Sequence, residues 1–145
     1  GGKWHSGIWE GGTWLGGQWL NGRWLGGTWK IGEWFGGTWV AGTWLGGSWI
    51  HGTWRNGEWM SGMWQQGTWY DGEWNGGTWN GGEWLTGTWN GGEWHGGTWH
   101  DGVWKGGTWL GGTWLKGKIK DKNGNFVHSD VSPAEFYAKE RENNR

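Results

Sequence analysis

The chain has 145 residues, no cysteine and one proline, whereas glycine and tryptophan supply 37 and 23 of its positions. So much glycine is typical of disordered segments, but an aromatic content of 19% argues for an ordered chain. The net charge of −1 gives no sign of a nucleic-acid or membrane partner, and the lack of cysteine excludes disulfides, thiolate zinc sites and cysteine nucleophiles.

The first predicted element is a five-residue repeat that occupies residues 1–118. Tryptophan occurs at position 4 and at every fifth residue to position 114, which accounts for all 23 tryptophans. Glycine occurs at every fifth residue from 2 to 117, so the unit reads Gly-x-Trp-x-x. A helix is excluded, because each glycine would cost about 1 kcal/mol relative to alanine. Threonine and other β-forming residues beside tryptophan indicate very short strands.

Two all-β architectures satisfy this repeat. The residue before the repeat glycine is mostly Gly, Asn or Asp, and such pairs are typical of tight hairpin turns. The chain would then be an antiparallel meander with every indole on one face and roughly 110 Å of sheet, at about 4.8 Å per strand. Alternatively, each unit forms one side of a four-sided β-solenoid with tryptophan pointing inward, which gives about six coils and a length of roughly 30 Å.

The indoles are predicted to form the interior in either architecture. Every tryptophan keeps the same place in its unit, as a core requires, whereas a ligand platform would vary along its length. Representative core positions are Trp14, Trp34, Trp54, Trp74, Trp94 and Trp114.

Several strings resemble known repeat families. Gly12 before Trp14 matches the spacing of pentapeptide-repeat proteins, which implies a quadrilateral β-solenoid, although that family has Leu or Phe in place of Trp and Ala in place of Gly. The string Gly-Glu-Trp-Phe-Gly-Gly at 32–37 more distantly resembles the hairpin core of MORN repeats, which form single-layer sheets. Asn-Gly-Gly-Glu-Trp at 80–84 resembles the uncharacterized Trp/Gly pentad-repeat proteins of tailed bacteriophages and bacteria. This last resemblance extends over residues 2–118 and implies a structural or accessory protein of a virion.

The residue after tryptophan divides the repeat into two halves. It is mostly apolar in the first half and mostly polar from 75 to 105. Because side chains next to tryptophan should point away from the indoles, the first half is expected to expose an apolar strip that contacts another subunit. The predicted contact residues are Leu15, Leu20, Leu25, Phe35, Val40, Leu45 and Ile50.

The residue before tryptophan is mostly Thr or Glu, and the two alternate strictly between 68 and 98. Glu73, Glu83 and Glu93 therefore recur every ten residues and could line up as a carboxylate ladder. A solvated face fits these carboxylates better, because stacked like charges lower stability.

The sequence offers little catalytic chemistry. His95 and His100 stand in successive units, but in a meander they would point to opposite sheet edges, so we expect no metal there. No Ser-His-Asp pattern stands apart from the repeat, and the Gly-Gly steps are periodic turns rather than nucleotide-binding loops. We therefore expect neither an enzyme nor a bound cofactor.

The chain beyond the repeat, residues 119–145, is predicted to form a cap of a hairpin and a helix. Asn123-Gly124 is a hairpin turn, Ile119 and Phe126 take the place of tryptophan, and alternating lysines should block edge pairing. A helix is expected from about 133 to about 142, with a capping box, a hydrophobic staple and aromatic side chains over the end of the core. An equally weighted alternative is that this segment docks into a neighbouring subunit. The predicted cap residues are Ile119, Phe126, Val131, Ser132, Glu135, Phe136 and Tyr137.

These observations predict a non-enzymatic structural protein, a rigid repeat scaffold of a virion or an extracellular assembly. Its expected partners are other protein subunits, in a homo-oligomer or a larger assembly, and neither nucleic acid nor membrane. The alternatives are a carbohydrate-binding module whose indoles stack on a glycan, and an ice-binding surface built from the threonines.

Overall fold

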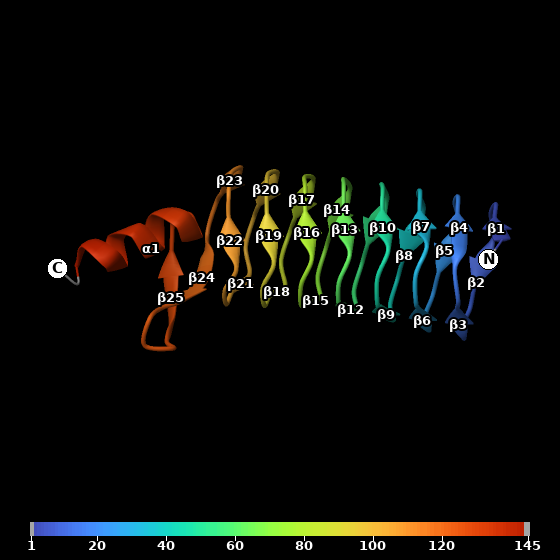
Figure 1. The fold of residues 1–145 in the computed structure, drawn as a ribbon, viewed down its shortest axis with the longest axis horizontal. Coiled ribbons are helices and arrows are strands. Elements are labelled where there is room, and N and C mark those ends of the chain that lie inside the picture. The colour runs from blue at the N-terminus through green and yellow to red at the C-terminus, as the bar shows by residue number, and fades with distance from the viewer. Residues whose placement is uncertain (1, 144–145) are drawn as a thin grey trace.

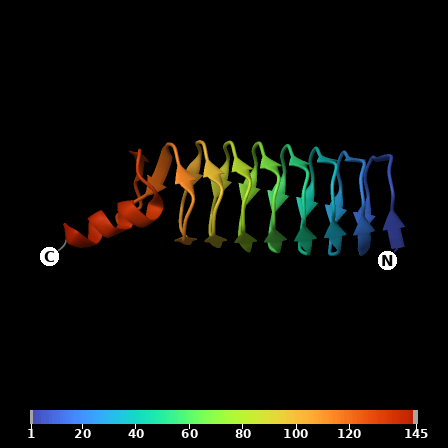
Figure 2. The same ribbon diagram turned by 90° about the horizontal axis from the view of Figure 1, so that it is seen from above.

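Each Gly-x-Trp-x-x unit forms one side of a coil, and three units complete a coil of 15 residues (Figures 1 and 2). The computed structural model describes residues 2–143. The successive coils stack into a three-sided β-solenoid, because every strand of the repeat pairs in parallel with the strand 15 residues away. The expected β-solenoid is thus confirmed, whereas the antiparallel meander and the four-sided coil are wrong.

Three sheets, here called A, B and C, run the length of the solenoid. The strands of sheet A are β1 (Gly2–Trp4), β4 (Gly17–Trp19), β7 (Glu33–Trp34), β10 (Ser48–Trp49), β13 (Met63–Trp64), β16 (Thr78–Trp79), β19 (Glu93–Trp94) and β22 (Thr108–Trp109). Those of sheet B are β2 (Ile8–Trp9), β5 (Arg23–Trp24), β8 (Thr38–Trp39), β11 (Thr53–Trp54), β14 (Thr68–Trp69), β17 (Glu83–Trp84), β20 (Thr98–Trp99) and β23 (Thr113–Trp114). Those of sheet C are β3 (Thr13–Trp14), β6 (Thr28–Trp29), β9 (Thr43–Trp44), β12 (Glu58–Trp59), β15 (Glu73–Trp74), β18 (Thr88–Trp89), β21 (Val103–Trp104), β24 (Gly117–Lys120) and β25 (Phe126–Ser129).

Two backbone hydrogen bonds per unit join neighbouring coils. In sheet C, Thr43 donates its N–H to the carbonyl oxygen of Gly27 at 3.0 Å, and Leu45 donates to the carbonyl of Trp29 at 2.8 Å. The same two bonds recur around the solenoid, so the backbone polar groups of these very short strands are satisfied despite their length.

The corners between the sheets are solenoid bends rather than the predicted hairpin turns. The residue that needs a left-handed conformation is the repeat glycine: Gly47 has φ of +107°, and a Cβ on it would overlap the carbonyl oxygen of Gly32. The residue before it has no such need, since no non-glycine residue among 2–143 has positive φ. Asn at that place supports the bend, as when Asn56 Oδ1 accepts a hydrogen bond from Gly57 N at 2.8 Å.

The interior of the solenoid consists of three columns of stacked indoles. Trp34 lies parallel to Trp49 in the next coil, with ring centroids 4.8 Å apart, and meets Trp39 of its own coil edge-on at 5.9 Å. These are favourable arrangements for aromatic rings, and three indoles fill one coil, which explains why it has three sides. Every tryptophan from Trp19 to Trp104 has no exposed surface. Among the predicted core positions, the four inner ones belong to this set and the two end ones, Trp14 and Trp114, are 8% exposed.

Side-chain hydrogen bonds contribute little to this core. Four indoles of the repeat donate their N–H to the carbonyl of a corner glycine, as Trp29 does to Gly46 at 3.1 Å. Within residues 2–143, seventeen other buried indole N–H groups have no protein acceptor. Because each unpaired buried donor costs about 1–3 kcal/mol, ring burial, ring stacking and the backbone ladders must hold the coils together.

The C-terminal hairpin extends sheet C alone. Strands β24 and β25 are antiparallel, and Ile119 is fully buried in the place of tryptophan, as predicted. Phe126 does not take that place. It pairs with Lys120 on the outer face, while Val127 lies opposite Ile119. The prediction for Phe126 is wrong because residues 121–125 form a five-residue loop rather than a two-residue turn, which shifts the register by one residue.

The expected C-terminal helix is confirmed as α1 (Pro133–Glu142). Ser132 caps it by accepting a hydrogen bond from Glu135 N at 3.3 Å. Phe136 and Tyr137 are partly buried against the indole core, and the helix then runs away from the last coil (Figure 2). Burial raises the pKa of the Tyr137 phenol, and the nearby Glu140 carboxylate raises it further, against a lowering by a hydrogen bond with Trp104.

Candidate functional site

The outer face of each sheet carries one column of side chains, contributed by the residue before tryptophan. Because a coil contains an odd number of units, the Thr/Glu alternation along the chain becomes an alternation along each column. Glu93, for example, lies between Thr78 and Thr108 on sheet A. The possible carboxylate ladder at ten-residue spacing is therefore wrong, because Glu73, Glu83 and Glu93 lie on sheets C, B and A respectively.

One pair of carboxylates nevertheless does stack, and one column is rich in threonine. Glu58 and Glu73 are direct neighbours on sheet C, and both are exposed. On sheet B, five of six successive positions are threonine and only Glu83 interrupts them. These threonines are Thr38, Thr53, Thr68, Thr98 and Thr113.

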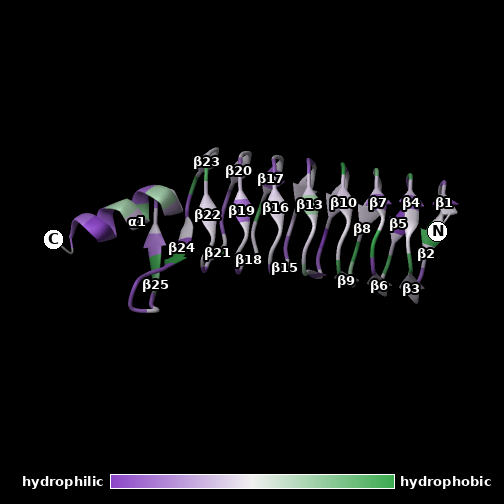
Figure 3. Cartoon of the chain, in the orientation of Figure 1, coloured by the Kyte–Doolittle hydropathy of each residue, from purple (hydrophilic) through white to green (hydrophobic). Residues whose placement is uncertain are grey.

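The predicted apolar strip is distributed over the three corners of the solenoid. Leu20, Phe35 and Ile50 lie one above another in successive coils at the corner after sheet A, here called the apolar corner. Leu25 and Val40 are neighbours at the corner after sheet B. The other two residues lie at the corner after sheet C, where Lys30 separates them; they are Leu15 and Leu45. Figure 3 shows the apolar colouring concentrated in the N-terminal half.

The histidines lie at separate corners and face carboxylates. His95 Nε2 is 3.2 Å from Glu93 Oε1, and His100 Nε2 is 3.1 Å from Glu83 Oε1. In the part of the chain that the structure describes, no three histidine or acidic side chains are grouped so as to hold a metal ion. The described segment also lacks a helix that is both long enough and apolar enough to cross a membrane.

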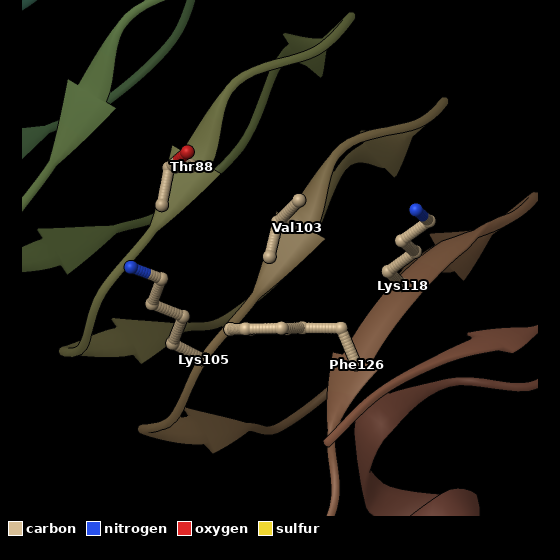
Figure 4. A pocket seen from close by; sticks show the side chains of 5 residues that line it. All are labelled: Thr88, Val103, Lys105, Lys118 and Phe126. Atoms are coloured by element: carbon tan, nitrogen blue, oxygen red, sulfur yellow. The ribbon is translucent and has the colours of Figure 1, made fainter. Parts of the chain in front are cut away.

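A groove of about 280 Å³ lies where sheet C meets the C-terminal hairpin (Figure 4). Thr88, Val103 and Lys118 are successive members of the sheet C column, on strands β18, β21 and β24. Lys105 follows β21, and Phe126 enters from β25. The Lys105 ammonium is 5.9 Å from the centroid of the Phe126 ring, within the range of a cation–π contact.

The groove is electropositive. None of the four ion pairs found within residues 2–143 involves Lys105 or Lys118. His128, which pairs with Lys118 across the hairpin, is itself 3.0 Å from Asp130. Two ammonium groups therefore border an apolar floor of Val103 and Phe126 without a carboxylate partner.

The sequence contained one signal of this groove. Val103 occupies a place that Thr or Glu holds in most units, so it interrupts a polar column with an apolar side chain. Joining Val103 to Lys118, however, required the 15-residue coil, and adding Phe126 required the hairpin register. Neither could be read from a five-residue period.

These features define the class of protein: a pentad-repeat β-solenoid with a tryptophan core and a hairpin-helix cap. No protein-family model matches the chain, and no curated protein matches it. The chain is similar to a proposed acetyltransferase from Desulfovibrio desulfuricans, with a TM-score of 0.25 and 6% identity over 86% of this chain and 35% of that one. A proposed acetyltransferase from Bacillus cereus gives a TM-score of 0.19 and 4% identity, over 97% and 90% of the two chains.

A polysialic acid O-acetyltransferase gives a TM-score of 0.20 and 8% identity, over 90% of each chain. The chain spans about a third of the length of the Desulfovibrio protein. TM-scores this low carry no argument about activity.

Proposed function

We propose that the chain is a non-enzymatic structural protein, a rigid repeat scaffold of a virion or an extracellular assembly. The supporting observation is the unbroken run of fully buried indoles from Trp19 to Trp104, which makes the repeat a rod whose length follows from the number of units. The resemblance of the Trp/Gly pentads to bacteriophage proteins favours the virion. Each coil supports its neighbours, and such quasi-one-dimensional stacking suits a spacer or scaffold.

The contact surfaces of this scaffold are the apolar corner and the C-terminal segment. At the apolar corner, Phe35 is 36% exposed, and Leu20 and Ile50 on either side are partly exposed. Contiguous apolar side chains on a surface favour a protein partner. The C-terminal helix runs beyond the last coil and so offers a second contact along the axis (Figure 1).

The assembly state of surface variants tests this proposal. We expect the combined variant L20D/F35D to shift the protein to a smaller species in analytical ultracentrifugation, because carboxylates would have to be buried at the contact. Gln65→Asp and Asn80→Asp are matched controls, since both residues lie in the same corner column of later coils. Circular dichroism should show an intact fold in all variants. An assembly state that L20D/F35D leaves unchanged contradicts the role of the apolar corner.

An ice-binding surface is a second candidate, favoured by the threonine column of sheet B. Thr38, Thr53 and Thr68 repeat at the strand spacing of about 4.8 Å. Thermal hysteresis measured on the full chain tests it: Glu83→Thr should extend the column and raise the activity, and Thr53→Lys should lower it. No thermal hysteresis in the unaltered chain would exclude this candidate. A glycan platform of indoles gains no such support, because Trp19 to Trp104 are inaccessible.

A further inference from the structure

The groove at the end of sheet C combines apolar surface with unneutralised positive charge. Val103 lies between Lys105 and Lys118, and the Phe126 ring reaches toward Lys105 from the hairpin (Figure 4). Phe126 is 47% exposed, so its ring is open to contact. An occupant of the groove would satisfy both features if it carried an apolar body and an anionic group.

We propose that this groove binds a small aromatic carboxylate. The ring of such a ligand can pack against Val103 and Phe126, because aromatic rings interact favourably when offset-stacked or edge-to-face. Its carboxylate can accept charge-assisted hydrogen bonds from the Lys105 and Lys118 ammonium groups. The volume of about 280 Å³ lies at the small end of ligand sites and fits one ring system rather than a nucleotide cofactor.

The site depends on the junction between the repeat and its cap. Lys30 holds the same place as Lys105 in its own unit on sheet C, five coils earlier, but no hairpin lies beside it. Only the last coils combine a lysine of this column with the Phe126 ring. The inference goes beyond the scaffold function and is independent of it, because the groove lies on sheet C rather than at the apolar corner.

Methyl NMR on the full chain can test the proposal with 2-naphthoate as the probe. The chain has only four valines, namely Val40, Val103, Val127 and Val131, so valine methyl labelling gives a simple spectrum. We expect naphthoate to shift the Val103 methyl signals saturably and to leave Val40, on sheet B, unmoved. The neutral analogue 2-naphthamide should bind more weakly, because it lacks the charge.

Lysine variants then separate the groove from general attraction to positive charge. Lys105→Gln and Lys118→Gln should each weaken naphthoate binding about two- to five-fold, the range for partly exposed ion pairs. Lys30→Gln is the matched control and should leave the affinity unchanged. Phe126→Ala should also weaken binding, with its Trp emission checked for an intact core. The proposal is overturned if the Val103 signals do not move, or if Lys30→Gln weakens binding as much as Lys105→Gln does.

Discussion

Trp34 lies parallel to Trp49, with ring centroids 4.8 Å apart and ring planes within 6° of each other. The same relationship continues through the three columns, so each inner indole has a ring above it and a ring below it. Removing one ring therefore removes two stacking contacts as well as its buried surface.

Trp54→Ala should destabilise the solenoid by about 3–5 kcal/mol, the usual cost of truncating a large buried aromatic side chain. Trp4 is only half-buried at the N-terminal coil, so Trp4→Ala should cost less. Thermal and urea unfolding followed by circular dichroism compare the two variants. Equal losses at the two positions would show that central burial does not dominate the stability.

The glycines at one corner differ sharply in their tolerance of a side chain. Gly47→Ala should destabilise the fold by more than about 1–2 kcal/mol, because alanine disfavours positive φ and its Cβ would overlap the Gly32 carbonyl. Gly46→Ala should be nearly neutral, since the nearest heavy atom to a Cβ there is the Lys30 carbonyl oxygen at 3.7 Å. Melting temperatures of this adjacent pair test the assignment of the left-handed position, and a greater loss for Gly46→Ala would contradict it.

The stacked carboxylates on sheet C should be a small liability. Glu73→Thr removes the like-charge contact with Glu58 and should stabilise the fold by about 0.2–1 kcal/mol, an effect that added salt diminishes. Glu93→Thr is the control. Glu93 already lies between two threonines and faces His95, so its replacement should bring no gain. A gain that is equally large for both variants, or that salt does not affect, argues against charge repulsion.

The cap should loosen at high pH. Because burial raises the pKa of Tyr137 in the folded state, its stabilising contribution is complete below the ordinary tyrosine pKa and is lost as the pH rises through the raised value. Tyrosinate absorbance of the Tyr70→Phe variant isolates Tyr137, the only other tyrosine. We expect this variant to titrate at higher pH when folded than in denaturant. Coincident titrations would contradict the burial of Tyr137 in the cap.

The sequence was sufficient for the features that depend on local pattern. The constant phase of tryptophan predicted the dry interior, and Ser132 with Glu135 located the start of α1. The number of sides could not be predicted in this way, because a five-residue period is compatible with any polygon. Three sides follow from how many indoles fill one coil, as in the edge-on contact of Trp34 with Trp39.

The candidate groove was less predictable than the core, and Phe126 shows why. The pair Asn123-Gly124 indicated a two-residue turn, but the side chain of Asp121 accepts hydrogen bonds from the backbone N–H groups of Asn123 and Asn125 and so holds a longer loop. One residue of difference in the loop places Phe126 outside rather than inside. Sequence pattern alone does not reveal such a side-chain bridge.

The three-unit coil also governs how this protein could change its length. Deleting 15 residues would shorten the rod by one storey and return every later side chain to its original sheet. Deleting a single unit of five would instead turn the whole remainder, cap included, by one face of the prism, so that surface features once aligned would point in different directions. Duplication in multiples of three units is therefore the route by which such a rod can be lengthened while the bearing of its two ends is kept.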